Sequence, residues 1–469
     1  MTEESLIYLG GSSVDGSGPG LSSTGLKMGG RSVMIDCGIE ILKGRRYRVP
    51  DFSILGDTKV SALVNTHAHL DHIGSVGLAS ERMALKSGAK IYGSPQTNAW
   101  LPSVIAETWC RGVGQNYYMC NNRVIDMLKD IPFGEFELLP GIPAFTGAAG
   151  HVPGALYIII RTPSGKRILF CGDNSWHDQA VVKGSRLPDD VPDKWLPDVV
   201  AVLDLTNPSL TKLDYGLEMG RLVDHVVEAL AKKKTVVIAA FAYGRVQNVA
   251  LDLAPVLAKA GLGPVYVDGS ATDVFDVFEK NRWSPNDNEF SLEGIKLISD
   301  DEVTGIRKGR KRAQLLDHGG PLCIAAPAGF GDGGPVRYFL EKGINNPNFE
   351  FIASSWLLPG CTMERLLQKV HKREETRKKV YMKLEDENSE REELMLEVKC
   401  DATHFRPGAH GGLGDNVEMI KKIVARRGKK LEMIGLTHAS YESKQVAAGV
   451  LRQYADSTIP IFPGTEIRI

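Results

Sequence analysis

The chain has 469 residues and a formal net charge of −1 at pH 7, with 43% hydrophobic and 24% charged residues. This length exceeds what one hydrophobic core usually needs, so we expect two domains or one domain with a large insertion. No apolar run could span a membrane, no signal peptide is recognisable, and the seven scattered cysteines lack a CxxC pair, which together indicate a cytoplasmic protein with reduced thiols.

The densest group of potential metal ligands follows a short apolar segment. Residues 61–65 are expected to form a buried strand, which leads into the sequence THAHLDH. This sequence supplies His67, His69, Asp71 and His72. The spacing of His67 and His69 lets two imidazoles reach one cation, while Asp71 and His72 point toward a second position. Imidazole and carboxylate ligands suit Zn²⁺, so we expect a metal centre here rather than a histidine-rich surface loop.

Two further ligand candidates also follow segments with strand character. His151 lies among small residues in GAAGHVPG, where glycine lets the backbone crowd a metal centre. Asp173 ends the segment 168–173, although a Gly-Asp pair alone is usually a turn. Together with the first cluster they complete a set, with three histidines for one cation and Asp173 placed to bridge to a second.

The order HxHxDH, then His, then Asp, each at a strand end, resembles the metallo-β-lactamase fold, an α/β architecture of the αββα sandwich type. The segments 7–11 and 32–38 look like the first strands of that fold. The resemblance implies a seventh ligand near the end of the chain. His438 fits, because it follows the apolar segment 431–436.

The long segment between Asp173 and His438 identifies a branch of the superfamily. Residues 241–247, FAYGRVQ, follow a strand-like segment and resemble the FAxGRxQ signature of the β-CASP nucleases, whose α/β cap domain is inserted into the lactamase core. The resemblance implies a lactamase domain over 1–207 and 401–469, and a cap over 208–400. It also assigns Asp204 and His410 to two family motifs. The sequence departs from the usual family motifs at three places. These are the residues on either side of His410, the residue Asn248 directly after FAYGRVQ, and the residues Ala439 and Ser440 directly after His438.

The resemblance implies a metal-dependent ribonuclease that hydrolyses RNA phosphodiester bonds with a hydroxide activated by two metal ions. His67, His69 and His151 would hold one Zn²⁺, Asp71, His72 and His438 the other, and Asp173 would bridge them; Mn²⁺ is an alternative metal. His410 would contact a phosphate oxygen or protonate the leaving oxygen, and Asp204 would orient a histidine. Phosphate binding is expected at Gly244 and Arg245, where a helix begins, and at the loop containing Gly329 and Gly331.

Single-stranded RNA is the expected partner, because RNA-processing members of the family carry a histidine at the position of His438 and DNA nucleases tend to carry valine. The net charge gives no global attraction for nucleic acid, so basic clusters at 307–312 and 421–430 are either local RNA contacts or solvated helix faces. A homodimer or protein partners stay open, and no membrane association is expected.

Three other functions are alternatives. A small-molecule hydrolase of the thioesterase type would share the first six ligands, but FAYGRVQ, His410 and the large insertion argue against it. A DNA nuclease of the same family is the second alternative. A catalytically inactive scaffold is the third, and the seven filled ligand positions argue against it.

Overall fold

The computed structural model describes residues 3–13, 20–42, 46–56, 59–81, 84–110, 117–210, 214–299, 308–384 and 394–469. Their contacts divide the chain into two compact units. Unit 1 contains Met1–Leu213, Lys280–Asn288 and Ala409–Ile469, and unit 2 contains Asp214–Glu279 and Glu289–Gly408. The domain boundaries expected from the sequence precede these divisions by a few residues, and the return of Lys280–Asn288 to unit 1 has no sequence signal. The charged stretch 385–393 lies outside the described residues.

The first sheet of unit 1 joins strands from both ends of the chain, in the order β24-β1-β2-β3-β6-β7-β8. The strands β3, β6, β7 and β8 are parallel to one another, and β1 is antiparallel to β2 and β24. The bounds are β24 (Glu466–Arg468), β1 (Glu4–Tyr8), β2 (Thr24–Met28), β3 (Arg31–Ile35), β6 (Val60–Val64), β7 (Leu85–Gly93) and β8 (Leu128–Asp130). A separate hairpin pairs β4 (Glu40–Leu42) with β5 (Arg46–Arg48).

The second sheet of unit 1 has the order β23-β22-β13-β12-β11-β10-β9. Its centre is parallel, because β22 and β12 both run alongside β13 in the same direction. The bounds are β23 (Ala455–Pro460), β22 (Leu431–Thr437), β13 (Val199–Asp204), β12 (Arg167–Phe170), β11 (Leu156–Arg161), β10 (Ile142–Ala148) and β9 (Gly134–Leu139).

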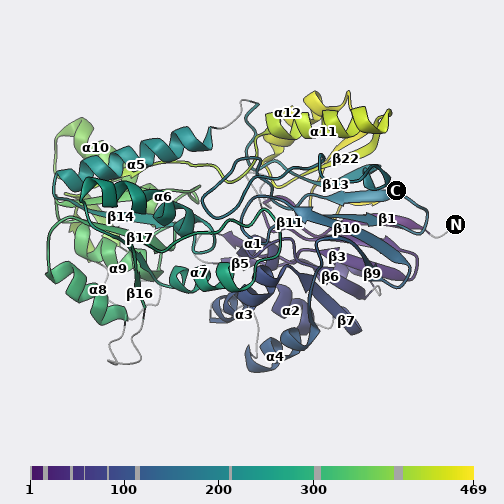
Figure 1. The fold of residues 1–469 in the computed structure, drawn as a ribbon, viewed down its shortest axis with the longest axis horizontal. Helices are drawn as coiled ribbons and strands as arrows, with labels where there is room; N and C mark the ends of the chain where they lie inside the picture. Colours follow the sequence, from purple (N-terminus) through teal and green to yellow (C-terminus); the bar gives the residue numbers. More distant parts are fainter. Residues whose placement is uncertain are drawn as a thin grey trace. The chain divides into compact units, whose positions relative to one another are not determined.

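The two sheets of unit 1 pack face to face around one hydrophobic core. Leu6, Val33 and Val64 of the first sheet share this core with Ile158 and Phe170 of the second. Such apolar runs of β-branched and aromatic residues favour strands that are buried on both faces. Helices cover the outer faces: α2 (Val76–Glu81), α3 (Pro95–Cys110) and α4 (Tyr117–Met127) lie beside the first sheet, and α11 (Leu413–Arg427) and α12 (Tyr441–Leu451) lie beside the second (Figure 1). The predicted αββα sandwich is therefore confirmed.

The helices of unit 1 pack on these sheets through buried side chains that recur at helical spacing. In α12, for example, Lys444, Ala447 and Leu451 are spaced to face one side and are buried. The bounds are α1 (Leu70–Ile73), α2 (Val76–Glu81), α3 (Pro95–Cys110), α4 (Tyr117–Met127), α11 (Leu413–Arg427) and α12 (Tyr441–Leu451), with short 3-10 turns η1 (Phe52–Leu55) and η2 (Asp193–Trp195).

Unit 2 is built on one parallel sheet with the order β16-β15-β17-β14-β18-β21. The strand bounds are β14 (Thr235–Ala240), β15 (Val265–Asp268), β16 (Ile295–Ile298), β17 (Leu322–Pro327), β18 (Phe349–Ala353) and β21 (Asp401–His404), with β19 (Tyr381–Leu384) and β20 (Leu394–Glu397) as a hairpin. Helices α5 (Tyr215–Ala231), α6 (Arg245–Ala260) and α7 (Ala271–Lys280) pack on one face, and α9 (Gly334–Gly343) and α10 (Thr362–Thr376) pack on the other, with α8 (Lys308–Asp317) following β16. In the described part of the chain, no helix is long and apolar enough to cross a membrane.

Candidate metal centre

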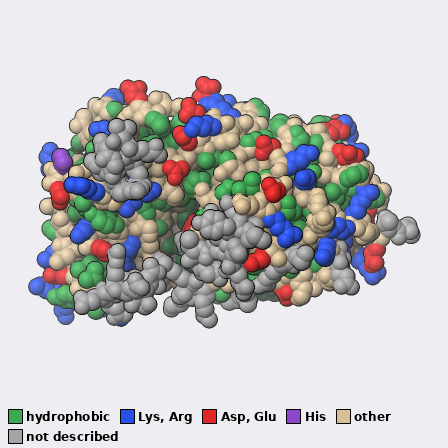
Figure 2. Space-filling view, turned by 90° about the horizontal axis from the view of Figure 1, so that it is seen from below, with side chains coloured by type: hydrophobic (Ala, Val, Ile, Leu, Met, Phe, Trp, Pro, Cys, Tyr) green, Lys and Arg blue, Asp and Glu red, His purple; other side chains and the backbone are tan. Residues whose placement is uncertain are grey.

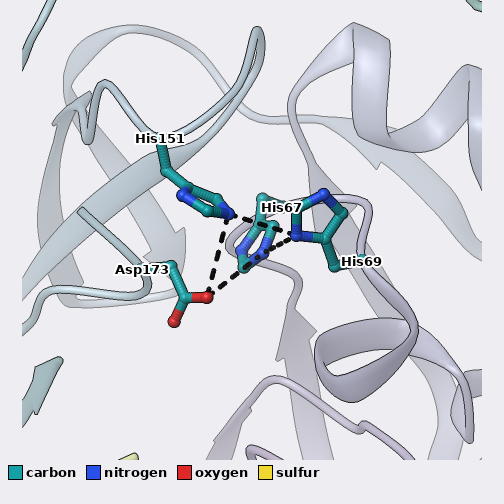
Figure 3. A group of neighbouring side chains, drawn as sticks. All are labelled: His67, His69, His151 and Asp173. Atoms are coloured by element: carbon teal, nitrogen blue, oxygen red, sulfur yellow. Dashed lines mark hydrogen bonds and ion pairs between the residues drawn. The ribbon is translucent and has the colours of Figure 1, made fainter. Parts of the chain in front are cut away.

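Three imidazoles and one carboxylate of unit 1 converge from the ends of three strands (Figure 3). His67 and His69 follow β6, His151 follows β10, and Asp173 follows β12. The nitrogen His69 Nδ1 lies 3.1 Å from both His67 Nε2 and His151 Nε2, and Asp173 Oδ2 lies 3.7 Å from His67 Nε2. These four side chains therefore direct ligand atoms toward one common point.

A second group lies beside the first and shares Asp173 with it. Asp71 and His72 belong to the short helix α1, and His438 directly follows β22. His72 Nε2 lies 3.2 Å from Asp173 Oδ1, the carboxylate oxygen that the first group does not face, and His438 Nε2 lies 3.3 Å from Asp71 Oδ2. Because Asp173 presents one oxygen to each group, the seven residues form two adjacent groups that could each hold a cation, and we call them the two ligand sets.

The donor atoms of these sets are available for a cation, because other groups hold the opposite ring nitrogens. The Nδ1 atoms of His72, His151 and His438 lie 2.8 Å from Asp36 Oδ2, the Ala409 carbonyl oxygen and Thr206 Oγ1 respectively. The buried Nε2 atoms of His72 and His438 make no hydrogen bond within the described part of the chain, and each faces a carboxylate, that of Asp173 at 3.2 Å and that of Asp71 at 3.3 Å. A divalent cation bound between them would satisfy these nitrogens and the carboxylates that they face.

Electrostatics keep part of the first group in the form that binds metals. Burial lowers the pKa of His67 well below its usual value, and the neighbouring His72 ring lowers it further. Burial likewise lowers the pKa of His151 well below its usual value, with His410 and His69 acting in the same direction. Both imidazoles are therefore neutral at physiological pH, as metal ligands must be.

Asp204 and His410 form a third cluster with Asp173. Asp204, at the end of β13, is fully buried, and its Oδ2 accepts a hydrogen bond from His410 Nδ1 at 2.9 Å. Its Oδ1 accepts the backbone N–H of Thr206 at 2.9 Å. The carboxylate therefore fixes the orientation of the His410 ring. The same ring packs against His151, with ring centroids 4.4 Å apart.

Two residues that the sequence reasoning did not single out support the ligands. Asp36 accepts the backbone N–H of Thr66 at 2.7 Å in addition to its contact with His72, and Thr206 contacts His438. Asp36 and His438 both have left-handed backbone, with φ of 60° and 55°, a strained conformation that concentrates at functional sites. The sequence feature that could have indicated a role for Asp36 is its position directly after an apolar strand.

One glycine lets the ligand loop approach the rest of the unit. A Cβ atom on Gly38 would lie 1.6 Å from the carbonyl oxygen of Asp71, far inside van der Waals contact. The backbone of Ser22 makes two hydrogen bonds beside this contact. Its N–H donates to the Asp71 carbonyl at 2.7 Å, and its carbonyl accepts the N–H of Gly38 at 3.0 Å. The segment after β3 thus holds α1, and with it Asp71 and His72, at the site.

The four residues expected to bind phosphate, Gly244, Arg245, Gly329 and Gly331, belong to unit 2. Gly244 and Arg245 begin α6, whereas Gly329 and Gly331 lie between β17 and α9. Arg245 is 8% exposed, and its buried Nη1 has no hydrogen-bond partner among the residues that the structure describes.

Most basic side chains of the cluster 421–430 lie on α11 and are ion-paired. Lys421, Lys422, Arg426 and Arg427 form ion pairs with Glu418, Asp189, Asp193 and Asp198 respectively. Basic and acidic side chains are also interspersed on the face of the molecule shown in Figure 2. In the other cluster, Arg312 pairs with the buried Asp268, and Arg307 lies outside the described residues.

Residues 20–208 match the model of the metallo-beta-lactamase superfamily. The chain is 23% identical over 469 aligned residues to the probable RNase MJ4 of Methanocaldococcus jannaschii, covering 96% of this chain and 97% of that protein. It is also 23% identical over 339 residues to Ribonuclease TTHA0252 of Thermus thermophilus, covering 69% of this chain and 73% of that protein. A crystal structure of a protein of unknown function from Enterococcus faecalis is similar in fold, with a TM-score of 0.55 at 12% identity and full coverage of both chains.

Proposed function

Because the chain belongs to the metallo-β-lactamase superfamily, among the β-CASP nucleases, we propose that it is a metal-dependent ribonuclease that hydrolyses phosphodiester bonds of single-stranded RNA. The observation that carries the proposal is the pair of ligand sets that share Asp173. A binding protein would not need such a set, since two adjacent cation sites are typical of enzymes that displace groups at phosphorus.

The proposal assigns His67, His69 and His151 to one Zn²⁺ and Asp71, His72 and His438 to a second, with Asp173 between them. When bound, two such cations lower the pKa of a water molecule toward neutrality and stabilise negative charge on a phosphoryl oxygen. The lactamase domain corresponds to unit 1 and the cap to unit 2. Manganese is the alternative metal, because imidazole and carboxylate ligands accept it as well.

The protein side chains then supply orientation and a proton. Asp204 holds His410 by a hydrogen bond of 2.9 Å. Burial alone would lower the pKa of His410, but the Asp204 carboxylate raises it above the usual value. The ring therefore keeps a proton near neutral pH and serves to protonate the leaving oxygen or to bind a phosphate oxygen. Arg245 and the loop of Gly329 and Gly331 bind neighbouring phosphates of the strand.

The proposal is tested with end-labelled single-stranded RNA and DNA of the same sequence. We expect the metal-replete protein to cleave the RNA, and we expect Asp71→Ala to lose cleavage while keeping its far-UV circular dichroism. Cleavage of DNA alone would favour the DNA nuclease of the same family. Cleavage of neither strand by protein that binds metal would exclude the ribonuclease and favour the small-molecule hydrolase.

A further inference from the structure

Three aromatic side chains of unit 2 follow the carboxyl ends of three neighbouring strands. Phe241 directly follows β14, Phe330 follows β17, and Trp356 follows β18. The strand β14 lies between β17 and β18 and is parallel to both, so the loops carrying these rings emerge at one edge of the sheet.

The three rings are in consecutive edge-to-face contact. The centroids of Phe241 and Phe330 are 5.6 Å apart at an interplanar angle of 89°, and those of Phe330 and Trp356 are 5.9 Å apart at 76°. This T-shaped arrangement is favoured for aromatic pairs. Phe241 and Phe330 are half-buried, but Trp356 is 46% exposed. The row therefore ends in a large aromatic ring that is open to solvent.

The backbone holds this row in place. The Phe330 carbonyl accepts the N–H of Met363 at 2.9 Å, and Ala328 has left-handed backbone with φ of 80° and accepts the N–H of Gly331 at 2.8 Å. Before Trp356, the N–H of Ser354 donates to the Ala239 carbonyl at 3.1 Å. Rings on an ordered backbone lose little conformational entropy when a ligand stacks on them.

The row lies where the strand connections diverge. From β14 the chain passes through α6, on one face of the sheet, to β15; from β17 it passes through α9, on the opposite face, to β18. The connections after the adjacent strands β14 and β17 thus leave in opposite directions. In parallel sheets, ligands bind at the carboxyl ends of strands at such a divergence.

An unpaired polar group beside these loops indicates that the ligand is also polar. Ser355, next to Trp356, has a buried Oγ that makes no hydrogen bond within the described part of the chain. It lies close to the row, because a Cβ on Gly329 would be 3.0 Å from Ser355 Oγ and 3.5 Å from Phe241 Cδ1. A purely apolar partner would leave this hydroxyl unsatisfied.

We propose that Phe241, Phe330 and Trp356 form a stacking platform for an unpaired base of single-stranded RNA, with Trp356 as the ring that the base contacts. A flat base covers the exposed aromatic face, and its ribose and phosphate supply an acceptor for the unpaired Ser355 hydroxyl. The inference rests on the proposed ribonuclease function and adds a base-binding site to it.

The test is an anisotropy titration of the full-length protein with two labelled ligands, hexauridine RNA and a hexamer with the same phosphates but abasic riboses. All proteins contain Asp71→Ala to prevent cleavage. We expect Trp356→Ala to weaken binding of hexauridine about tenfold or more and Trp356→Phe to restore most of it. Tyr381→Ala is the matched control, because Tyr381 is a 49% exposed aromatic residue of unit 2 outside the row.

Binding of the abasic hexamer should be the same with and without Trp356→Ala. Equal affinity of the parent and Trp356→Ala proteins for hexauridine would overturn the inference and would leave the ring for another occupant, such as a partner protein. An equal loss with both ligands would also overturn it, because the effect would not depend on the base.

A second measurement separates this inference from the proposed function. Hydrolysis of bis(4-nitrophenyl) phosphate and of RNA is measured with protein that retains Asp71. RNA cleavage by that protein combined with no effect of Trp356→Ala on RNA affinity would overturn the platform alone. If the protein neither cleaves nor binds RNA, both the platform and the ribonuclease proposal fail.

Discussion

The Nδ1 atom of His410 donates a hydrogen bond to Asp204 Oδ2 across 2.9 Å, and the accepting carboxylate is fully buried. Neither residue belongs to the two ligand sets, although both lie close to Asp173 and the His410 ring packs against His151. We therefore expect His410→Ala to lower kcat for RNA cleavage about 10²- to 10⁴-fold, the usual contribution of a proton-transferring group, without loss of bound metal. Steady-state kinetics combined with metal analysis of the same preparation checks both parts.

Asp204→Asn is the companion change, because it removes the charge that keeps His410 protonated. If Asp204 acts through His410, the double variant should be no slower than His410→Ala alone. Multiplicative losses in the double variant would show that the two side chains act independently. Loss of metal from His410→Ala would instead place His410 among the ligands.

The carboxylate of Asp36 is expected to set the metal affinity through His72. In Asp36→Asn, an amide N–H₂ would face His72 Nδ1, which now lies 2.8 Å from Asp36 Oδ2. The ring then loses its acceptor, and we expect zinc affinity to fall about 10- to 100-fold. Competition with a chromogenic chelator measures the change.

Asp198→Asn is the control for that variant. Asp198 is a buried acid of the same unit that pairs with Arg167 at 2.8 Å and belongs to none of the ligand groups. Its variant should bind zinc as the natural protein does. Equal affinities of the Asp36 and Asp198 variants would contradict the role given to Asp36.

Much of the site could be predicted because its ligands follow strands that the sequence makes evident. The apolar segment before His67 is β6, and the segments before Asp173 and His438 contain β12 and β22. The strands β12 and β22 both run parallel to β13, so the residues that follow them lie at one edge of the second sheet, while β6 brings its histidines from the first sheet. The approach of Asp36 to His72 was not predictable in the same way, because a single aspartate after a strand is usually a turn residue.

The aromatic row of unit 2 was not predictable from the sequence for a different reason. Phe241, Phe330 and Trp356 become neighbours only because β14 lies between β17 and β18. Strand order depends on long-range pairing, which the local sequence pattern does not specify. The return of Lys280–Asn288 to unit 1 is likewise a long-range effect: Asn286 Nδ2, for example, donates to the Gly184 carbonyl at 2.9 Å.

Lys444 should make the stability of unit 1 depend on pH above neutrality. The side chain is fully buried in α12, where its Nζ donates to the carbonyls of Ile461 and Gly11, and burial lowers its pKa from 10.5 to about 7. Between these values the folded state releases a proton that the unfolded state keeps. The free energy of unfolding should therefore rise with pH from about 7 to 10, by at most about 1.4 kcal/mol per pH unit.

Urea unfolding at pH 7 and pH 9 measures this effect, with Lys444→Met as the reference. The natural protein should gain more stability than Lys444→Met between the two pH values, because the increment is lost as pH falls through the folded-state pKa. An identical pH response of the two proteins would show that the buried amine does not titrate in this range.

Two glycines of unit 1 should respond oppositely to the same substitution. In β22, a Cβ on Gly435 would lie 2.3 Å from the Ala201 carbonyl oxygen of β13, so Gly435→Ala must separate two central strands. We expect a cost of about 1–3 kcal/mol. In α12, a Cβ on Gly449 meets nothing within 4 Å, and Gly449→Ala should stabilise by roughly 0.4–1 kcal/mol.

The urea midpoints of the two variants provide the comparison. A lower midpoint for Gly435→Ala and a higher one for Gly449→Ala is the expected result. A neutral Gly435→Ala would mean that β13 and β22 can move apart at little cost.

Cleavage of RNA should require both ligand sets to be filled with metal. The most direct test is a zinc titration of metal-free protein, with bound metal and the initial rate of RNA cleavage measured on the same samples. We expect no cleavage without metal and a rate that reaches its maximum near two equivalents of zinc per chain. Full cleavage by the metal-free protein, or by an Asp173→Ala variant that has lost metal from both ligand sets, would contradict this requirement.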